Sequence, residues 1–355
     1  MDAMEWSRVR RLLVARLDNL GDVLLCSPAL RTIKHHLSDA HVTLLASPGG
    51  SRAAALLPWV DDVLTWRPLW QDVDRRLPLD PRRELRLVAL LREGSYDAAV
   101  ILTSFAQSAL PLAYLCLLAG VPWRIGFFKE RCEGVLRPGV PAPPDHVHQA
   151  ERNLGLLEGA GLPAAHRHLA VAIPEAAREG VRDLLASVGV RPPYLVLTPG
   201  ASCSSRVYPW QRYAQVARRL VAETAWPVLV TGDERDADLA RRIGAEAGPG
   251  VVPVAGRTSV PELAALVAGA SGVLTNNTAT MHLADALDVP TVVLFAGTEL
   301  ESQWRPRRAP HRLLRVPTPC SPCYRFSCPY DGTCLDIAPE AVVRTMLQVL
   351  EARNR

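Results

Sequence analysis

Short apolar runs alternate with longer amphipathic segments along the chain, and this rhythm predicts parallel strands connected by helices. In the first half, strands are predicted at Arg11–Leu17, His41–Ala46, Asp62–Trp66 and Asp97–Thr103. Helices are predicted between and after them at Gly21–His36, Gly49–Leu57, Pro81–Arg92 and Ser104–Leu118. Several strands are apolar at almost every position, as expected of parallel strands covered on both faces. The first half therefore predicts a doubly wound α/β domain.

The pattern loosens after Gly126 through a Pro-rich segment, PGVPAPPDHVHQ, that is typical of a loop. Helices at His148–Ala160 and Pro174–Val188 follow. The rhythm then restarts with strands at Tyr194–Thr198, Pro227–Thr231, Val251–Val254, Gly272–Asn276 and Thr291–Phe295. The helices between and after them are predicted at Pro209–Glu223, Arg235–Ala247, Val260–Ala268, Thr278–Leu287 and Pro339–Ala352. This predicts an N-terminal domain over residues 1–173, a C-terminal domain over 174–335 and a last helical segment over 336–355.

Composition is that of a folded globular protein. A length of 355 residues favours two domains, and 48% hydrophobic with 21% charged residues is ordinary. The net charge of +4 permits an anionic ligand but does not indicate a nucleic-acid partner. The N-terminus lacks the apolar core of a signal peptide, and no apolar run approaches the length of a transmembrane span. We therefore expect a cytoplasmic protein, and its many arginines leave peripheral contact with an anionic membrane face open.

The stretch LLVARLDNLGDVLLCSPAL places Asp22 in a Gly-Asp pair between a buried strand and a helix. Open α/β sheets bind their ligands at the carboxyl ends of strands, so Asp22 is a candidate catalytic carboxylate. The alternative is that Asp22 only caps its helix, because Asp is favoured in the first turn. The local pattern alone favours the cap.

Two loops of the second half carry candidates for binding a nucleotide. In TPGASCSSRVYPW, Gly200 allows close backbone approach, and Arg206 offers a charged fork for phosphate just before a helix. In TGDERDAD, where Gly232 is the second residue, Asp233 or Asp236 could accept hydrogen bonds from ribose hydroxyls. Helix capping is the alternative for both carboxylates, and their spacing favours it.

A third loop, TNNTATMHLADAL, places polar residues between an apolar strand and a helix. Backbone N–H groups at such a helix start form an anion site, to which the hydroxyls of Thr278 and Thr280 would add donors. His282 could donate to a phosphate, although a single helical His is more often structural.

Together, RLDNLGDVLLCSPALRTIK, PGASCSSRVYPW and TNNTATMHLADALDVPTVVLFAGT resemble glycosyltransferase family 9, the ADP-heptose heptosyltransferases of lipopolysaccharide core assembly. The resemblance implies a GT-B fold, in which two Rossmann-like domains face a cleft. It also implies an inverting transfer without a catalytic metal or other cofactor. A nucleotide sugar, ADP-heptose first of all, would be the donor, and a glycan or small molecule the acceptor. The last helix would return to the N-terminal domain.

The resemblance also implies roles for individual residues. The general base of the family matches Asp22, and the phosphate-binding Lys of the family aligns with Arg206. The Asp-Ser/Thr-Gly…His segment of the family aligns with Asn277-Thr278-Ala279…His282, so Asn replaces an Asp and Ala replaces a Gly. These departures put the identity of the sugar in question. The residues around the base that we expect to contact the acceptor are Arg16, Asp18, Asn19 and Gly21.

Four of the eight cysteines are clustered, at Cys320, Cys323, Cys328 and Cys334. This density suits a structural zinc or iron site, and four free thiols in a compact loop are the equal alternative.

Two other functions remain open at this point. A sugar-nucleotide epimerase could use the same scaffold, since fold does not fix function. A non-catalytic nucleotide-sugar-binding protein could have lost its chemistry at Asn277 and Ala279. A dinucleotide-dependent dehydrogenase is disfavoured, because the first strand-helix turn has no G-x-G-x-x-G.

Overall fold

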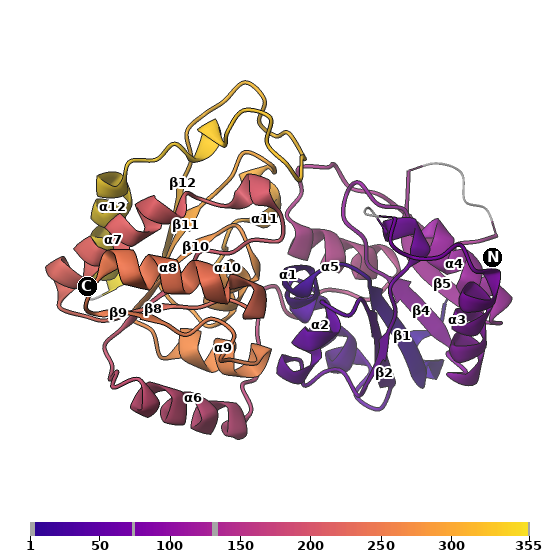
Figure 1. Ribbon diagram of the computed structural model, residues 1–355. Coiled ribbons are helices and arrows are strands. Elements are labelled where there is room, and N and C mark those ends of the chain that lie inside the picture. Colours follow the sequence, from indigo (N-terminus) through magenta and orange to yellow (C-terminus); the bar gives the residue numbers. More distant parts are fainter. Residues whose placement is uncertain (1–3, 73–74, 130–133, 354–355) are drawn as a thin grey trace. The chain divides into compact units, whose positions relative to one another are not determined.

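The computed structural model describes residues 4–72, 75–129 and 134–353. The chain forms two compact units, Met1–Ala170 and Val171–Arg355, and the division lies close to the predicted seam at Pro174 (Figure 1). No helix in the described ranges is long and apolar enough to cross a membrane.

The first unit is built on a six-stranded parallel sheet in the order β3-β2-β1-β4-β5-β6. Its strands are β1 (Arg11–Arg16), β2 (His41–Ala46), β3 (Asp62–Thr65), β4 (Ala98–Ile101), β5 (Trp123–Phe128) and β6 (Gly139–Pro141). Its helices are α1 (Leu20–Leu24), α2 (Ser27–His36), α3 (Pro81–Glu93), α4 (Leu110–Leu118) and α5 (Gln149–Gly159). Helices α3 and α4 pack together on one face, and α2 and α5 on the other (Figure 1).

The second unit repeats the same topology, with its sheet in the order β12-β11-β10-β7-β8-β9 and every pair parallel. Its strands are β7 (Leu195–Thr198), β8 (Val228–Val230), β9 (Val251–Pro253), β10 (Gly272–Asn276), β11 (Thr291–Leu294) and β12 (His311–Leu314). Its helices are α6 (Glu175–Ser187), α7 (Trp210–Thr224), α8 (Ala237–Ala247), α9 (Val260–Ala268), α10 (Ala279–Ala286), α11 (Glu301–Trp304) and α12 (Pro339–Arg353).

In each unit the order of strands reverses beside the first strand, between β1 and β4 and between β7 and β10. Loops that leave two such neighbouring strands diverge to opposite faces of the sheet and open a crevice at the carboxyl ends. The fold therefore places one candidate binding edge in each unit.

The second sheet separates two apolar cores. On one face, α7, α8 and α12 bury residues such as Tyr213, Ile243 and Met346. On the other face, α6 and α9 bury Val181 and Leu266. Complete burial of one such aliphatic side chain contributes about 1.5–3 kcal/mol relative to an exposed one. These layers hold the strands rigid, so that the strand ends carry the loops at fixed positions.

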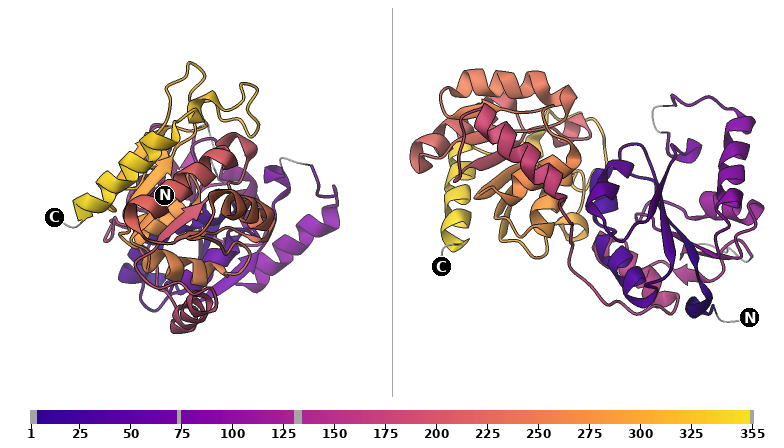
Figure 2. Two further views of the ribbon diagram at one scale, coloured as in Figure 1. Left: turned by 60° about the vertical axis from the view of Figure 1, so that its left-hand side comes forward. Right: turned by 90° about the horizontal axis from the view of Figure 1, so that it is seen from below.

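The last helix, α12, packs on α7 and on strands β10, β11 and β12 of its own unit, alongside the second sheet in Figure 2. The reason is its apolar face, because Val342, Met346 and Val349 fill the core of the second sheet.

Several element boundaries also differ from prediction. The helix predicted over Gly21–His36 is two helices, because Pro28 has no N–H to continue the hydrogen bonds of the first helix and occupies the first turn of a new one. The helix predicted from Ser104 begins only at Leu110. In the preceding loop, the Gln107 side chain accepts a hydrogen bond from the Ser104 N–H at 2.9 Å, an alternative to helical bonding. Within the Pro-rich segment, Gly139–Pro141 forms the edge strand β6.

Candidate functional site

At the switch point of the first sheet, polar side chains from the loops after β1 and β4 meet. Gln107, in the loop after β4, donates a hydrogen bond from Nε2 to Oδ1 of Asp18, in the loop after β1. The loop after β1 is further held by Ser47, whose hydroxyl donates to the Asp18 carbonyl at 2.5 Å. The sequence pattern gave no signal for Gln107 or Ser47 as partners of this loop.

Arg16, the last residue of β1, organises two carboxylates. Its side chain is fully buried, and its Nη2 donates to Oδ1 of Asp22 at 2.9 Å. Its Nε lies 2.8 Å from Oδ2 of Asp18, an ion pair in which the two groups are not aligned for a hydrogen bond. Nη1 has no hydrogen-bond partner among the described residues. One buried cation therefore serves two carboxylates that are themselves 16% and 18% exposed.

Asp22 also caps its helix, as the local pattern favours. Its Oδ2 accepts a hydrogen bond from the Asn19 N–H at 3.2 Å, within a capping box at the start of α1. The carboxylate thus has one oxygen on Arg16 and one on the helix start. Capping and partial exposure coexist in Asp22, so the cap does not exclude a chemical role.

The loop after β1 leaves little room beside it. A Cβ at Gly50 would lie 2.7 Å from the Asp18 carbonyl oxygen and 2.8 Å from Cγ2 of Val23, so only glycine allows the turn before the Ser51–Leu56 3₁₀ helix to approach. Gly21 is buried within α1. The four residues expected around the base are therefore held within one short segment.

Burial sets the acidity of the groups packed around Arg16. It raises the pKa of Asp18, with the nearby charge of Asp22 acting in the same direction and that of Arg16 opposing. Burial likewise raises the pKa of the Cys26 thiol to about 12. Cys26 is therefore a neutral thiol, and its Sγ donates to the Asp22 carbonyl at 3.3 Å.

The switch point of the second sheet is closed by Asn276, at the end of β10. Its Nδ2 donates to the carbonyl of Pro199, in the loop after β7, at 2.7 Å. Its Oδ1 accepts from the hydroxyl of Tyr213 at 2.9 Å. Asn276 is fully buried and ties together the two loops that carry the candidates Gly200 and Asn277.

Gly200 and Gly232 both pack against the side chain of Asp236. A Cβ at Gly200 would lie 2.4 Å from Oδ1 of Asp236, and one at Gly232 would lie 2.6 Å from its Oδ2. Oδ2 accepts a hydrogen bond from the Asp233 N–H at 3.1 Å, and burial raises the pKa of Asp236. The two glycines therefore make room for a protein carboxylate.

The carboxylate of Asp233 is also engaged in contacts within the protein. Its side chain caps the 3₁₀ turn Glu234–Asp236 and accepts from the guanidinium of Arg235 at 2.6 Å. For both aspartates the structure shows helix capping, the alternative that their spacing favours.

Arg206 lies in a short 3₁₀ turn before α7, and its guanidinium reaches the loop after β11. Nε donates to the Thr298 hydroxyl at 3.2 Å, and Nη2 donates to Oε1 of Glu299 at 2.7 Å. Oε2 of the same Glu299 accepts from Nδ2 of Asn277 at 3.1 Å. Two of the predicted donor-binding residues, Arg206 and Asn277, are thus brought together by a glutamate that sequence reasoning missed.

Four further candidates lie at the start of α10, directly after Asn277 in the chain. Thr278 precedes the helix, with its hydroxyl 3.3 Å from that of Thr275, and Ala279 is its first residue. Thr280 is buried in the first turn. Burial lowers the pKa of His282 to about 4, and the charge of Arg206 acts in the same direction. His282 is therefore a neutral imidazole at pH 7, not a cationic donor.

Two threonines at the same sheet edge were not predicted. Thr198 ends β7 and Thr231 follows β8, and both side chains are buried. Neither hydroxyl has a hydrogen-bond partner within the described ranges. Buried hydroxyls usually find a partner, so these two are exceptions at this sheet edge.

The cysteine cluster does not support the zinc or iron site. Across the described residues no group of three or more His, Cys, Asp or Glu is arranged to hold a metal ion. Two of the sulfur atoms instead accept hydrogen bonds from the backbone. Sγ of Cys328 accepts from the Gly332 N–H at 3.3 Å, and Sγ of Cys334 accepts from the Gly297 N–H at 3.2 Å. Cys320 is exposed and Cys323 is partly buried.

The loop that carries these cysteines packs on the Arg206 region. The Arg325 carbonyl accepts from the Ser205 hydroxyl at 2.6 Å, and the Tyr324 N–H donates to the Thr298 carbonyl at 2.9 Å. The loop therefore supports both the turn with Arg206 and the segment with Glu299.

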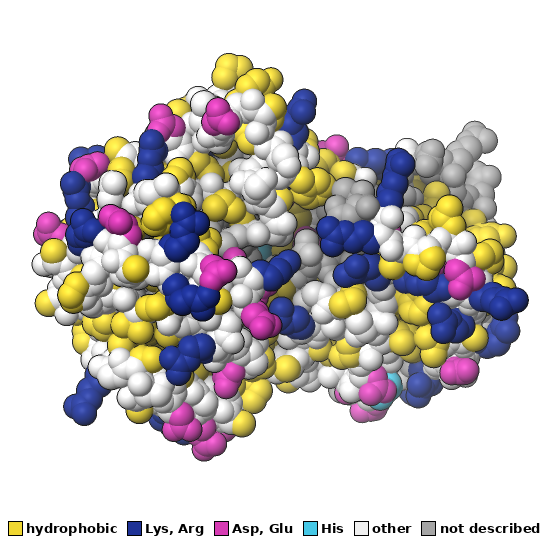
Figure 3. All heavy atoms as spheres, viewed as in Figure 1, with side chains coloured by type: hydrophobic (Ala, Val, Ile, Leu, Met, Phe, Trp, Pro, Cys, Tyr) yellow, Lys and Arg dark blue, Asp and Glu magenta, His cyan; other side chains and the backbone are white. Residues whose placement is uncertain are grey.

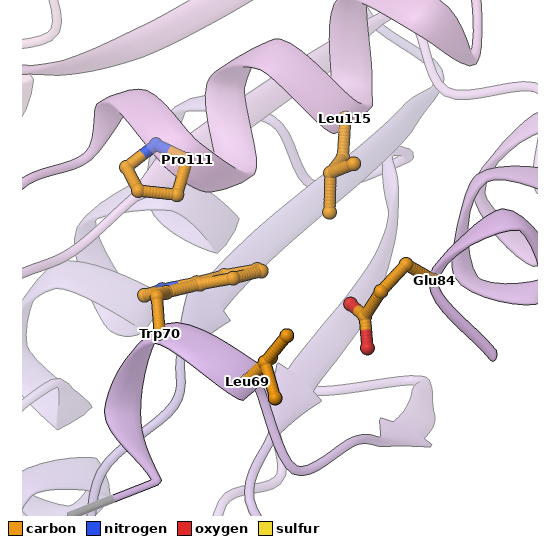
Figure 4. A pocket seen from close by; sticks show the side chains of 5 residues that line it. All are labelled: Leu69, Trp70, Glu84, Pro111 and Leu115. Carbon is orange, nitrogen blue, oxygen red and sulfur yellow. The ribbon is translucent and has the colours of Figure 1, made fainter. Parts of the chain in front are cut away.

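A cavity of about 320 Å³ lies apart from these polar groups, in the first unit. It is lined by Leu69, Trp70, Glu84, Pro111 and Leu115, and Figure 4 shows the Trp70 ring facing Pro111 and Leu115 of α4. The lining is almost wholly apolar, so the cavity has no resemblance to a phosphate or sugar site.

The chemistry that these groups allow is different in the two units. The first presents a held carboxylate that is partly exposed, which suits proton abstraction. The second presents a guanidinium and a helix start, which suit a phosphate.

Comparison with known proteins gives consistent matches over most of the chain. The model of glycosyltransferase family 9 (heptosyltransferase) matches residues 84–333. Lipopolysaccharide heptosyltransferase 3 of Escherichia coli is 26% identical, over 81% of this chain and 82% of the relative. Lipopolysaccharide heptosyltransferase 1 of Pseudomonas aeruginosa is 28% identical, over 91% of this chain and 88% of the relative. The solved structure of E. coli ADP-heptose lipopolysaccharide heptosyltransferase II superposes with a TM-score of 0.75 at 20% identity, covering 98% of this chain and all of that one.

Proposed function

Because this chain belongs to glycosyltransferase family 9 (heptosyltransferase), we propose that it transfers heptose from ADP-heptose to a hydroxyl group of a lipopolysaccharide core. Its fold is GT-B, and glycosyl transfer follows from its family. The choice of donor and acceptor is supported by the relatives, which are named lipopolysaccharide heptosyltransferases.

The proposed reaction is a single displacement with inversion. The acceptor hydroxyl oxygen attacks the anomeric carbon on the face opposite ADP, and Asp22 accepts the proton. The bond between the anomeric carbon and the phosphate oxygen breaks, and ADP leaves with the electron pair. A positioned base of this kind contributes about 10²–10⁴-fold to a rate.

The observation that carries the role of Asp22 is its ion pair with Arg16 at the switch point of the first sheet. A fully buried guanidinium fixes the carboxylate, while the carboxylate itself stays 18% exposed and accessible to a hydroxyl. Asp18 and Asn19, which are accessible, are proposed to contact the acceptor, and the buried Arg16 and Gly21 are proposed to hold their segment in place.

The leaving diphosphate is proposed to bind at the switch point of the second sheet. Arg206 supplies a permanent positive charge, and the N–H groups at the start of α10 supply donors next to Thr278 and Thr280. These groups would neutralise the developing charge without a metal ion. We propose only a structural role in this site, without contact to the ligand, for Gly200, Gly232, Asp233 and Asp236.

The direct test is a transfer assay with the purified protein, ADP-heptose and a lipopolysaccharide core that lacks its heptoses. We expect a heptosylated product of inverted configuration and unchanged turnover in EDTA. ADP-, UDP-, GDP- and dTDP-sugars are compared in parallel. Binding of a nucleotide sugar without transfer to any acceptor would instead indicate a non-catalytic binding protein. Isomerisation of the donor in the absence of acceptor would indicate an epimerase.

We further propose that the enzyme works at a membrane surface through the side of the first unit formed by α3 and α4. Six large apolar side chains are exposed there, which we call the α3–α4 patch: Leu79, Leu85, Leu90, Tyr114, Leu117 and Leu118. Arg82, Arg86 and Arg92 are exposed on α3, and Figure 3 shows hydrophobic and basic side chains interleaved over these helices. Apolar and basic groups together suit an anionic bilayer.

Sedimentation with vesicles tests this membrane role. We expect binding to vesicles with anionic phospholipid that is weakened in an L85E/L118E variant. The Y330E variant, which changes an exposed aromatic residue of the second unit, is the control and should bind as the unchanged protein does. Equal binding of all three proteins would remove the α3–α4 patch from the proposal.

A further inference from the structure

Glu299 presents a carboxylate among the residues proposed to bind the donor. It follows β11, and its two oxygens contact Nη2 of Arg206 at 2.7 Å and Nδ2 of Asn277 at 3.1 Å. The side chains of Glu299 and Arg206 are 15% and 19% exposed, so the pair is partly buried but accessible to a ligand.

The position of Glu299 is fixed from several directions. The Ala296 N–H donates to Oδ1 of Asn277 at 3.2 Å, which orients the amide so that its NH₂ group faces Glu299. The Thr298 hydroxyl accepts from Arg206, and the Cys323 N–H donates to the Gly297 carbonyl at 3.0 Å. The cysteine loop, which carries no metal site in the described residues, thus acts as the support of this carboxylate.

The amide side chain of Asn277 is what allows a carboxylate at Glu299. An Asp at 277 would repel Glu299, whereas the amide of Asn277 donates to it. The negative charge at the site thus comes from the loop after β11.

We infer that Glu299 is the specificity-determining carboxylate of the donor site, accepting hydrogen bonds from hydroxyls of the transferred sugar. The inference rests on the proposed function and adds which residue recognises the sugar. It requires Glu299 to act on the nucleotide sugar more than on the nucleotide, since a carboxylate repels phosphate and attracts hydroxyls.

A different role would be purely structural, with Glu299 holding Arg206 in place. The two roles differ in a measurable way. Loss of a structural partner weakens ADP and ADP-heptose together. Loss of a sugar contact weakens ADP-heptose and leaves ADP binding equal or tighter.

The test is calorimetric titration of ADP and ADP-heptose into the full-length protein and its E299Q variant. Glutamine keeps the size of the side chain, so folding is expected to be retained and is checked by circular dichroism. We expect the preference for ADP-heptose over ADP to fall about tenfold or more in E299Q, the loss typical of one charged hydrogen bond. The E301Q variant, which changes a glutamate paired with Arg315 at 3.3 Å, is the control and should keep the preference.

A charge exchange provides the second arm. N277D should weaken ADP binding, because it places two carboxylates side by side. The N277D/E299Q double variant, with one carboxylate and one amide in exchanged positions, should recover most of the preference for ADP-heptose. An equal loss of both ligands in E299Q, or no loss of either, overturns the inference while leaving the proposed function standing. Failure of the unchanged protein to bind any nucleotide sugar overturns both.

Discussion

Nη2 of Arg16 lies 2.9 Å from Oδ1 of Asp22, and the arginine side chain is fully buried while the carboxylate is not. The other oxygen of Asp22 accepts the Asn19 N–H at the start of α1. The carboxylate is therefore oriented by two partners that cannot move without disturbing the sheet or the helix. Such fixed orientation is what a base needs, because a misplaced base loses most of its effect.

Asp22→Asn should abolish most of the transfer activity. Asn can still accept the capping hydrogen bond from the helix start, but it cannot take a proton, so we expect a turnover about 10²–10⁴-fold lower with ADP-heptose binding unchanged. Single-turnover assays and calorimetry measure the two quantities. Asp39→Asn, at an exposed position of the same unit, is the control. Transfer by Asp22→Asn at nearly the unchanged rate shows that another group is the base.

Arg16→Met should destabilise the first unit by about 3–5 kcal/mol, because it removes the guanidinium that pairs with both Asp18 and Asp22 and leaves two partly buried carboxylates. Urea unfolding at pH 7 measures the loss. Arg8→Met, which breaks an exposed ion pair with Glu5, is the matched control and should change stability little. A loss no larger than that of the control contradicts the structural role of Arg16.

His282 should make the protein less stable in acid. Its folded pKa is lowered to about 4 from 6.5, so the unfolded chain binds the proton more readily between these values. The contribution of the neutral ring to the free energy of unfolding is fully present above pH 6.5. It falls as the pH drops toward 4, by up to roughly 3 kcal/mol. The difference between the unchanged protein and His282→Gln, measured by urea unfolding from pH 7 to pH 4.5, should follow this curve. His168→Gln, which replaces an exposed histidine, is the control.

Gly200→Ala should destabilise the second unit by about 1–3 kcal/mol, because the new methyl group would lie 2.4 Å from a carboxylate oxygen of Asp236. In an Asp236→Ala background the same change should cost much less, which a double-mutant cycle would record as coupling. Gly155→Ala in α5, where the methyl group would meet no atom within 4 Å, should be neutral or stabilising. Simple additivity of the two changes at 200 and 236 rules out the contact.

The local pattern predicted the elements well where it was continuous. The strands His41–Ala46 and Gly272–Asn276 and the helix Val260–Ala268 occur with the predicted bounds. It failed where a local bond competes with the pattern, as at Pro28 and Gln107. It also missed β5 and the two short edge strands β6 and β12.

The local pattern also identified only some of the candidate site residues. Asp22, Arg206 and Asn277 could be selected because each follows a strand, and strand ends are where parallel sheets bind ligands. The capping roles of Asp233 and Asp236 could be read from their spacing. Glu299 could not, because nothing in the segment around it shows that it meets a residue 93 positions earlier in the chain.

The sequence by itself determined which segments become strands and helices, and so which residues stand at strand ends, because apolar periodicity and turn residues act over a few positions. Only the tertiary structure decided which of those ends meet. The reversal of strand order beside β1 and β7 brings Gln107 to Asp18 and Asn276 to Pro199. Packing of the layers then placed Arg16 under two carboxylates and Glu299 between Arg206 and Asn277, through contacts that span many residues and leave no local trace.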